Sequence, residues 1–218
     1  TDGGGMCEGT ANNCTISGNT AEYGGGMVGG PGATANNCIV WYNAALFGKD
    51  LYGNVTATYS CSPDVRHGVD GNITNAPVLV SSSHIAADSP CRGAGSADYA
   101  TGTDIDGEAW ANPPSMGCDE PSGGLPVGPM EVDFVANESM VASGYPIRFL
   151  EQSHGELSAH VWDFGDGTRV TNSPFVEHAW AAAGTFDVVL TAYNADWTDG
   201  VSSTQNVVVV DAEATAIY

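Results

Sequence analysis

A short sequence pattern recurs at a nearly fixed spacing near the start of the chain. Gly3-Gly-Gly-Met6 returns as Gly24-Gly-Gly-Met27, and Ala11-Asn-Asn-Cys14 returns as Ala35-Asn-Asn-Cys38. A fainter copy ends at Cys61, so three cysteines recur at almost equal intervals. Periods in the twenties are typical of stacked single-coil units. Leucine-rich repeats share this period, but their leucine framework is missing here, so the repeat predicts a β-solenoid.

Stacked coils place equivalent side chains in columns. Neighbouring strands lie ~4.8 Å apart, so we expect Cys14, Cys38 and Cys61 to form one inward column. Short strands that begin at Cys14 and Cys38 should pair in register. Glycine and asparagine turn the corners because both tolerate a left-handed backbone. An asparagine there can also hydrogen-bond its counterpart in the next coil.

No two cysteines form the Cys-x-x-Cys pair that would indicate a zinc or thioredoxin-like motif. Packed free thiols and a disulfide between neighbouring coils both fit a column of cysteines. An oxidising compartment favours at least one disulfide, although the sequence does not choose among the possible pairings. The candidates are Cys7, Cys14, Cys38, Cys61, Cys91 and Cys118.

The charge balance excludes several classes of partner. Acidic residues outnumber basic ones 26 to 5, for a net charge of −21. Such a surface repels nucleic-acid phosphates and anionic lipids, whereas cations and neutral glycans remain compatible with it. Solubility in an extracellular setting is the simplest reason for the charge. No apolar run approaches the ~20 residues of a membrane helix, so no membrane insertion is expected.

Glycine use marks a boundary along the chain. Of 29 glycines, 23 precede residue 131, and an uncharged Pro- and Gly-rich stretch runs from Pro121 to Pro129. Such a stretch reads as a linker of limited flexibility. The expected organisation is a solenoid over residues 1–121, a linker over 122–130, a second domain over 131–211 and a tail over 212–218.

The second domain has the pattern of a β-sandwich. About seven short strands in ~80 residues are typical of an immunoglobulin-like fold. Trp162 and Phe164 alternate with polar or smaller residues and should face one side, and Gly165-Asp-Gly167 predicts a tight hairpin turn. The expected strands are Val132–Ala136, Pro146–Leu150, His160–Phe164, Thr168–Thr171, Phe175–His178, Phe186–Asn194 and Thr204–Val210.

Three motifs in fixed order give the first half a family resemblance. They are Ser89-Pro-Cys-Arg-Gly-Ala-Gly-Ser96, Thr103-Asp-Ile-Asp-Gly107 and Met116-Gly-Cys-Asp-Glu120. With the repeats before them, they resemble the end of pectin-lyase-like surface proteins of the choice-of-anchor type. This chain departs from that pattern at Arg92-Gly93 and at Cys118. The resemblance covers roughly residues 1–121 and implies the last coils of a right-handed parallel β-helix.

A different resemblance covers the second half. Trp162-Asp-Phe-Gly-Asp-Gly167, followed by His178 and Gly184-Thr-Phe-Asp-Val-Val-Leu-Thr191, closely resembles the signature of PKD domains. The resemblance spans residues 131–211. It implies a β-sandwich that serves as a spacer, a protein-interaction module or a carbohydrate-associated module, with no catalysis.

One loop is a candidate cation site. Asp104, Asp106 and Glu108 place oxygen ligands on alternating residues around Gly107, and hard cations such as calcium prefer such ligands. The alternative is an Asx-turn that is stabilised by its own backbone. No other cofactor is expected. Separately, glycosylation triplets place candidate acceptors at Asn54, Asn72 and Asn137.

Catalysis is not expected from this chain. Pectin-lyase-like enzymes use carboxylates with a basic residue in a groove, but only Lys49, Arg66 and Arg92 precede residue 121, and none lies in a cluster of aspartates. The five histidines have no metal-ligand spacing, so we interpret them as structural or solvated.

These observations predict a non-catalytic extracellular or cell-surface protein with a structural or adhesive role. The β-helix would form a rod, and the PKD-like domain a spacer or contact module for other surface proteins or glycans. The alternative is the accessory C-terminal region of a secreted polysaccharide-degrading enzyme. Because the chain opens at Thr1 without an initiator methionine or signal peptide, we expect Thr1 to be internal to a longer precursor. An uncovered first coil would otherwise favour a head-to-tail filament.

Overall fold

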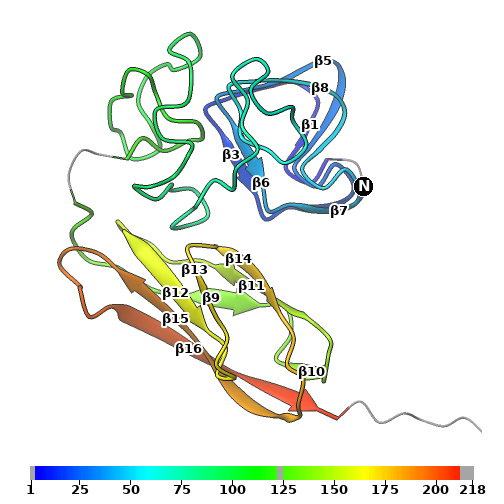
Figure 1. The fold of residues 1–218 in the computed structure, drawn as a ribbon, viewed down its shortest axis with the longest axis vertical. Helices are drawn as coiled ribbons and strands as arrows, with labels where there is room; N and C mark the ends of the chain where they lie inside the picture. The colour runs from blue at the N-terminus through cyan, green and yellow to red at the C-terminus, as the bar shows by residue number, and fades with distance from the viewer. Residues whose placement is uncertain (1–2, 122–124, 212–218) are drawn as a thin grey trace, which may run out of the picture. The chain divides into compact units, whose positions relative to one another are not determined.

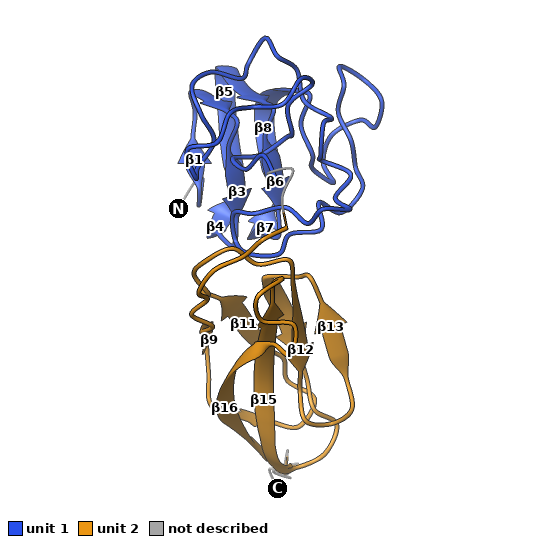
Figure 2. Cartoon of the chain, turned by 90° about the vertical axis from the view of Figure 1, so that its left-hand side faces the viewer, with its two compact units in different colours: residues 1–124 blue, residues 125–218 orange. Residues whose placement is uncertain are grey.

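A computed structural model describes residues 3–121 and 125–211, and all of its regular structure in these ranges is β-strand. The chain divides into two compact units, residues 1–124 and 125–218 (Figure 2). The division falls inside the expected linker, and the expected tail at 212–218 lies outside the described residues. Within those residues, no helix is long and apolar enough to cross a membrane.

The strands of the first unit stack on one another in parallel (Figure 1). In β2–β5, β3–β6 and β4–β7 the pairing joins the two copies of the repeat, as in Thr10 with Thr34 and Thr15 with Ile39. The expected in-register pairing is therefore confirmed. The strands are β1 Met6–Cys7, β2 Thr10–Asn12, β3 Thr15–Ser17, β4 Thr20–Tyr23, β5 Met27–Asn36, β6 Ile39–Trp41, β7 Ala44–Phe47 and β8 Leu51–Thr58.

Asparagine side chains connect successive turns of the chain. Asn36 donates from Nδ2 to Oδ1 of Asn12 at 2.9 Å, and Asn19 donates to Oδ1 of Asn43 at 3.0 Å. The neighbouring corner residues Asn13 and Asn37 have φ of 47° and 50°. Asparagine tolerates this left-handed backbone better than most residues, so both expected roles occur, but at different asparagines and not at one corner residue.

The repeated glycine triplets lie where successive backbones come closest. The Gly5 amide donates to the Gly26 carbonyl at 3.1 Å, and the Gly26 amide donates to the Lys49 carbonyl at 3.1 Å. A Cβ atom on Gly26 would lie 2.5 Å from the Asp50 carbonyl oxygen and 2.6 Å from a methyl of Val40. Glycine is therefore required by the close approach of the neighbouring turn.

The expected column of three cysteines is wrong at its third member. Cys14 and Cys38 share one core, but Cys61 pairs in register with Ile39 and belongs to another core. The residue that meets Cys38 is instead Ser60, whose hydroxyl accepts from the Cys38 amide at 3.1 Å. Cys61 is the next residue along, and neighbouring residues of a strand point to opposite faces.

The physical reason for this error is a change of register between β5 and β8. Met27 pairs with Leu51, as the repeat predicts, but the pairing shifts between Gly29 and Ala33. Beyond the shift, Ala33 pairs with Val55. The third turn is therefore shorter in the structure than the spacing of the cysteines indicates.

The wall made by β6 and Cys61 is apolar on both faces. One face packs on the core that contains Cys38 and Val40. The other is covered by a segment without regular strands, which lies beside β3 and β6 in Figure 1. This segment contributes the buried residues of the second core, namely Leu79, Ile85, Cys91 and Met116.

The second unit is a β-sandwich of two sheets. One sheet has the order β10-β16-β15-β12-β13 and the other β14-β11-β9. All neighbours are antiparallel except β10 and β16, which are parallel. The strands are β9 Phe134–Ala136, β10 Met140–Ala142, β11 Ile147–Glu151, β12 Ala159–Asp163, β13 Arg169–Thr171, β14 Phe175–His178, β15 Gly184–Tyr193 and β16 Val201–Val210.

An aromatic core joins the two sheets. Trp162 and Phe164 are both fully buried, as expected, and the turn at 165–167 joins β12 to β13. Phe149 packs against Trp162 with ring centroids 5.9 Å apart. The indole of Trp180 donates to the buried Phe164 carbonyl at 3.0 Å, so the polar edge of this core side chain is satisfied.

Part of the expected linker is held by the second unit. The Ala195 amide donates to the Pro126 carbonyl at 2.9 Å, and the Gly128 amide donates to the Asp196 carboxylate at 2.8 Å. Asn194 donates to the Gly128 carbonyl at 3.0 Å. Residues 126–128 therefore belong structurally to the sandwich.

The close approach at Gly26 predicts a large cost for a single methyl group. Gly26→Ala should lower the free energy of unfolding of the first unit by about 1–3 kcal/mol, because the added Cβ overpacks a backbone contact. Thermal melts followed by circular dichroism measure this. Gly30→Ala is the control, since its Cβ would meet only the flexible end of Glu8. Equal melting of the two variants would contradict the interpretation.

The hydrogen bond of Trp180 predicts a second effect. Trp180→Phe keeps an aromatic ring but leaves the Phe164 carbonyl without its indole donor, which should cost about 1–3 kcal/mol. Urea denaturation of the whole chain measures the change. Trp197→Phe, at a half-exposed site, should change stability by less than about 0.5 kcal/mol. A neutral Trp180→Phe variant would show that the bond contributes nothing.

Candidate functional site

The loop that carries the expected calcium ligands is held by the carboxylate of Asp104. Its Oδ1 accepts hydrogen bonds from the amides of Asp106 at 3.1 Å and Glu108 at 2.7 Å, and its Oδ2 accepts from the Glu120 amide at 3.0 Å. Asp104 is buried. Both of its carboxylate oxygens thus accept hydrogen bonds from backbone amides, and the bond from Asp106 forms an Asx-turn.

The Asp106 side chain instead lies close to a histidine that no sequence motif indicated as a ligand. Its Oδ2 lies 2.9 Å from Nε2 of His84. Ligand-type atoms of His84, Asp106 and Asp119 all lie within 4.8 Å of one another, and we call these three residues the His84 cluster. Glu108 is not part of this cluster. The calcium site at Asp104, Asp106 and Glu108 stays a prediction.

Neighbouring groups fix the side chains of the His84 cluster. Nδ1 of His84 lies 2.8 Å from the Ser81 hydroxyl and 3.0 Å from the Ser83 hydroxyl. Asp119 accepts from the Ile85 amide at 2.9 Å, and burial raises the pKa of its carboxyl to about 6. Sequence reasoning missed the cluster because its members come from three segments and share no local motif.

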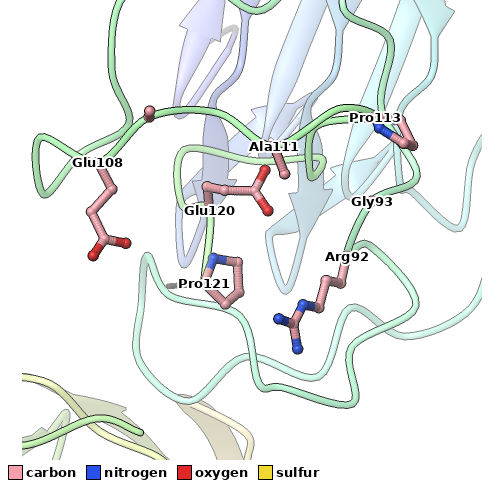
Figure 3. A pocket seen from close by; sticks show the side chains of 8 residues that line it. Arg92, Gly93, Glu108, Ala111, Pro113, Glu120 and Pro121 are labelled. Carbon is pink, nitrogen blue, oxygen red and sulfur yellow. The ribbon is translucent and has the colours of Figure 1, made fainter. Parts of the chain in front are cut away.

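A shallow pocket of about 450 Å³ lies near the end of the first unit. Figure 3 shows Glu120 and Pro121 between Glu108 and Arg92. Both carboxylate oxygens of Glu120 are engaged, since they accept from the Ser115 amide at 2.7 Å and from its hydroxyl at 2.9 Å. A carboxylate bound in this way is poorly placed to act as an acid or base toward a ligand.

Aromatic side chains from β4, β7 and β8 lie together at the surface of the first unit. The rings of Tyr23 and Phe47 stack with centroids 5.1 Å apart, and the ring centroid of Tyr52 lies 5.5 Å from that of Tyr23. Phe47 is 52% exposed and its neighbour Leu46 is 78% exposed. We call Tyr23, Phe47 and Tyr52 the aromatic ladder. An exposed group of this kind is a candidate contact surface.

The six cysteines are free thiols, and two pairs of them lie close together. A hydrogen bond with Cys38 lowers the pKa of Cys14 to about 6, whereas contact with Cys14 and burial raise the pKa of Cys38. Contact with Cys91 and burial likewise raise the pKa of Cys61. The expected disulfide is not present in this structure and stays a prediction.

The three candidate glycosylation sites differ in exposure. Asn54 and Asn137 are exposed, whereas Asn72 is buried. Asn72 accepts from the Ser60 amide at 2.8 Å and donates to the Ala57 carbonyl at 2.8 Å. A side chain with both ends of its amide bonded inside the fold is poorly placed to receive a glycan.

Charged groups of the sandwich stabilise the turn between β12 and β13. Asp166 lies 2.8 Å from His178, whose ring stacks on Phe164. Burial alone would raise the pKa of Asp166, but hydrogen bonds from the Thr168 amide and from His178 hold it below its usual value. These contacts close the loop between β12 and β13.

Comparison with known proteins characterises the second unit. Residues 131–209 match the family model described as PKD domain. They are therefore a PKD domain, as their motifs predicted. Comparison with curated proteins gives no match.

Several solved structures are similar to part of the chain. One concerns the promiscuous specificity of carbohydrate-binding modules of the β-sandwich superfamily, with 26% identity over 38% of this chain and 35% of that chain, and a TM-score of 0.33. This chain thus spans about a third of that protein. The PKD1 domain of Vibrio anguillarum Epp is 21% identical, and the match covers 38% of this chain and 94% of that domain, with a TM-score of 0.32. The PKD domain of human SorCS2 is 19% identical, and the match covers 44% of this chain and 85% of that domain, with a TM-score of 0.33.

The thiol pair predicts selective reactivity of Cys14. In fully reduced protein, alkylation of Cys14 by iodoacetamide should rise as pH increases through about 6, because the thiolate reacts and Cys38 stabilises it. Peptide mapping separates this site from the exposed Cys7. Cys38→Ala should move the transition toward the ordinary cysteine value of about 8.5. Identical profiles for both proteins would contradict the role of Cys38.

Proposed function

We propose that this chain is a non-catalytic structural and adhesive part of an extracellular or cell-surface protein. In this proposal the first unit is the last part of a right-handed parallel β-helix of the choice-of-anchor type, and the PKD domain is a spacer or interaction module. Parallel, in-register stacking of the repeat supports the first assignment. The family match over residues 131–209 supports the second.

The observation that carries this proposal is that buried carboxylates of the first unit are bonded to the chain itself. Asp104 and Glu120 accept hydrogen bonds from amides of the chain itself. Asp50 likewise accepts from the Asn43 amide at 3.1 Å and from its side chain at 2.9 Å. These groups stabilise a scaffold, and a scaffold that presents an exposed surface is suited to contact.

The aromatic ladder is the proposed contact surface. Flat exposed rings with a polar handle on the tyrosines suit partners that combine apolar faces with hydroxyl groups. Neutral glycans have this character, whereas anionic glycans would be repelled by a chain of net charge −21. Other surface proteins are the second class of partner. Self-association into a filament remains a prediction that light scattering can test.

Disulfide formation fits the same extracellular setting. With a small disulfide oxidant such as oxidised glutathione, two cysteine thiols become one disulfide while the oxidant is reduced to two thiols. Cys14 with Cys38 and Cys61 with Cys91 are the proposed pairs, because each pair is in contact. Intact mass with and without reduction, followed by peptide mapping, identifies any bridge.

Binding to insoluble polysaccharides tests the contact surface. The whole chain should adsorb to neutral polymers such as chitin or cellulose more than to anionic polygalacturonate. Phe47→Ala should weaken this adsorption by about tenfold, or ~1.4 kcal/mol, since the ring leaves the surface. Tyr145→Ala, at an exposed position in the sandwich, is the matched control. Adsorption that is absent, or equal in both variants, would refute glycan contact at the ladder.

A further inference from the structure

We propose that His84, Asp106 and Asp119 bind one divalent transition-metal ion of the zinc class. The ion would tie together three segments of the first unit that lie far apart in sequence. The inference is independent of the adhesive function, because it rests on a different set of side chains. It also differs from the calcium site expected from the sequence, with which it shares only Asp106.

The chemistry of the ligands favours zinc over calcium. The His84 cluster offers one imidazole nitrogen and two carboxylates, and imidazole suits zinc and its neighbours in the first transition row. Zinc accepts mixed nitrogen and oxygen ligands in a four-coordinate site. Calcium needs about six to eight oxygens, and the nearby carboxylate of Asp104 is occupied by backbone amides.

The geometry requires only small adjustments of side chains. Zinc ligands at about 2.0–2.2 Å from the metal lie roughly 3.4 Å from one another in a tetrahedron. The three ligand atoms already lie within 4.8 Å of one another, and Nε2 of His84 is 2.9 Å from Oδ2 of Asp106. Asp106 is exposed on its loop and gives the ion a path from solvent, with water as the fourth ligand.

The surroundings orient the ligands as metal sites commonly require. Metal-binding histidines usually donate their second ring nitrogen to a fixed partner. Here the Ser81 and Ser83 hydroxyls lie 2.8 and 3.0 Å from Nδ1, where either can accept a proton from Nδ1 when Nε2 binds the metal. Asp119 is fixed separately by the Ile85 amide.

The position of the cluster explains what the ion would do. The segments that carry its three members cover the core formed by Ile85, Cys91 and Met116, yet they contain isolated bridges rather than paired strands. A metal ion that joins such segments adds binding free energy to folding free energy. We therefore expect zinc to raise the melting temperature of the first unit.

Calorimetry of the untagged, chelator-stripped chain under reducing conditions tests the proposal. Zinc chloride should bind with a stoichiometry of one and raise the melting temperature, whereas calcium at the same concentration should do neither. Co²⁺ should give the intense visible absorption of a four-coordinate site. A near-ultraviolet thiolate band with Co²⁺ would assign the metal to cysteines and overturn the proposal.

Variants locate the site. His84→Ala and Asp106→Asn should each weaken zinc binding by about 100-fold or more, and Ser81→Ala by roughly tenfold, as expected for an outer partner. His67→Ala, which removes an exposed histidine elsewhere in this unit, and Cys14→Ser should bind zinc as the parent does. Asp106 is exposed, so Asp106→Asn keeps the test valid if His84→Ala fails to fold. Absent zinc binding, or binding unchanged in Asp106→Asn, would show that His84 and Asp106 form only an ion pair.

Discussion

The close approach of successive turns of the backbone governs the first unit. Where a Cβ atom on Gly26 would lie 2.5 Å from the Asp50 carbonyl oxygen, no larger residue fits without movement of the chain. This approach brings the amides of one turn to the carbonyls of the next and sets the register of the repeat. The register in turn aligns Asn12 with Asn36 and Asn19 with Asn43, so the polar corners are satisfied by one another.

A second constraint follows from the wall that is apolar on both faces. Such a wall needs cover on its outer side, and the long segment after Cys61 supplies it. That segment has little regular structure, so side chains must satisfy its backbone groups. Asp104 and Glu120 do so, each accepting from an amide of this segment. Acidic residues that look like a functional cluster in the sequence are largely used in this way.

Sequence reasoning succeeded where the interactions are local and failed where residues far apart in the chain meet. The repeat, the asparagine corners and most strands of the sandwich were predictable because their signals are local, and β14 was predicted with its observed bounds. β10 was missed because it is short and pairs with β16, at the far end of the same domain. Cys61 was misplaced because a register change at Gly29–Ala33 is invisible in cysteine spacing. The His84 cluster was missed because its members meet only in the folded chain.

The parallel pairing of β10 with β16 has a mechanical consequence. Met140, Val141 and Ala142 lie beside Val208, Val209 and Val210 near the two ends of the PKD domain's sequence. Once β9 is released from β11, tension applied to the chain on either side of this domain would pull the two strands in opposite directions along their length. Their hydrogen bonds would then share the load together rather than break one after another. The short edge strand β10 would therefore help the domain to resist stretching.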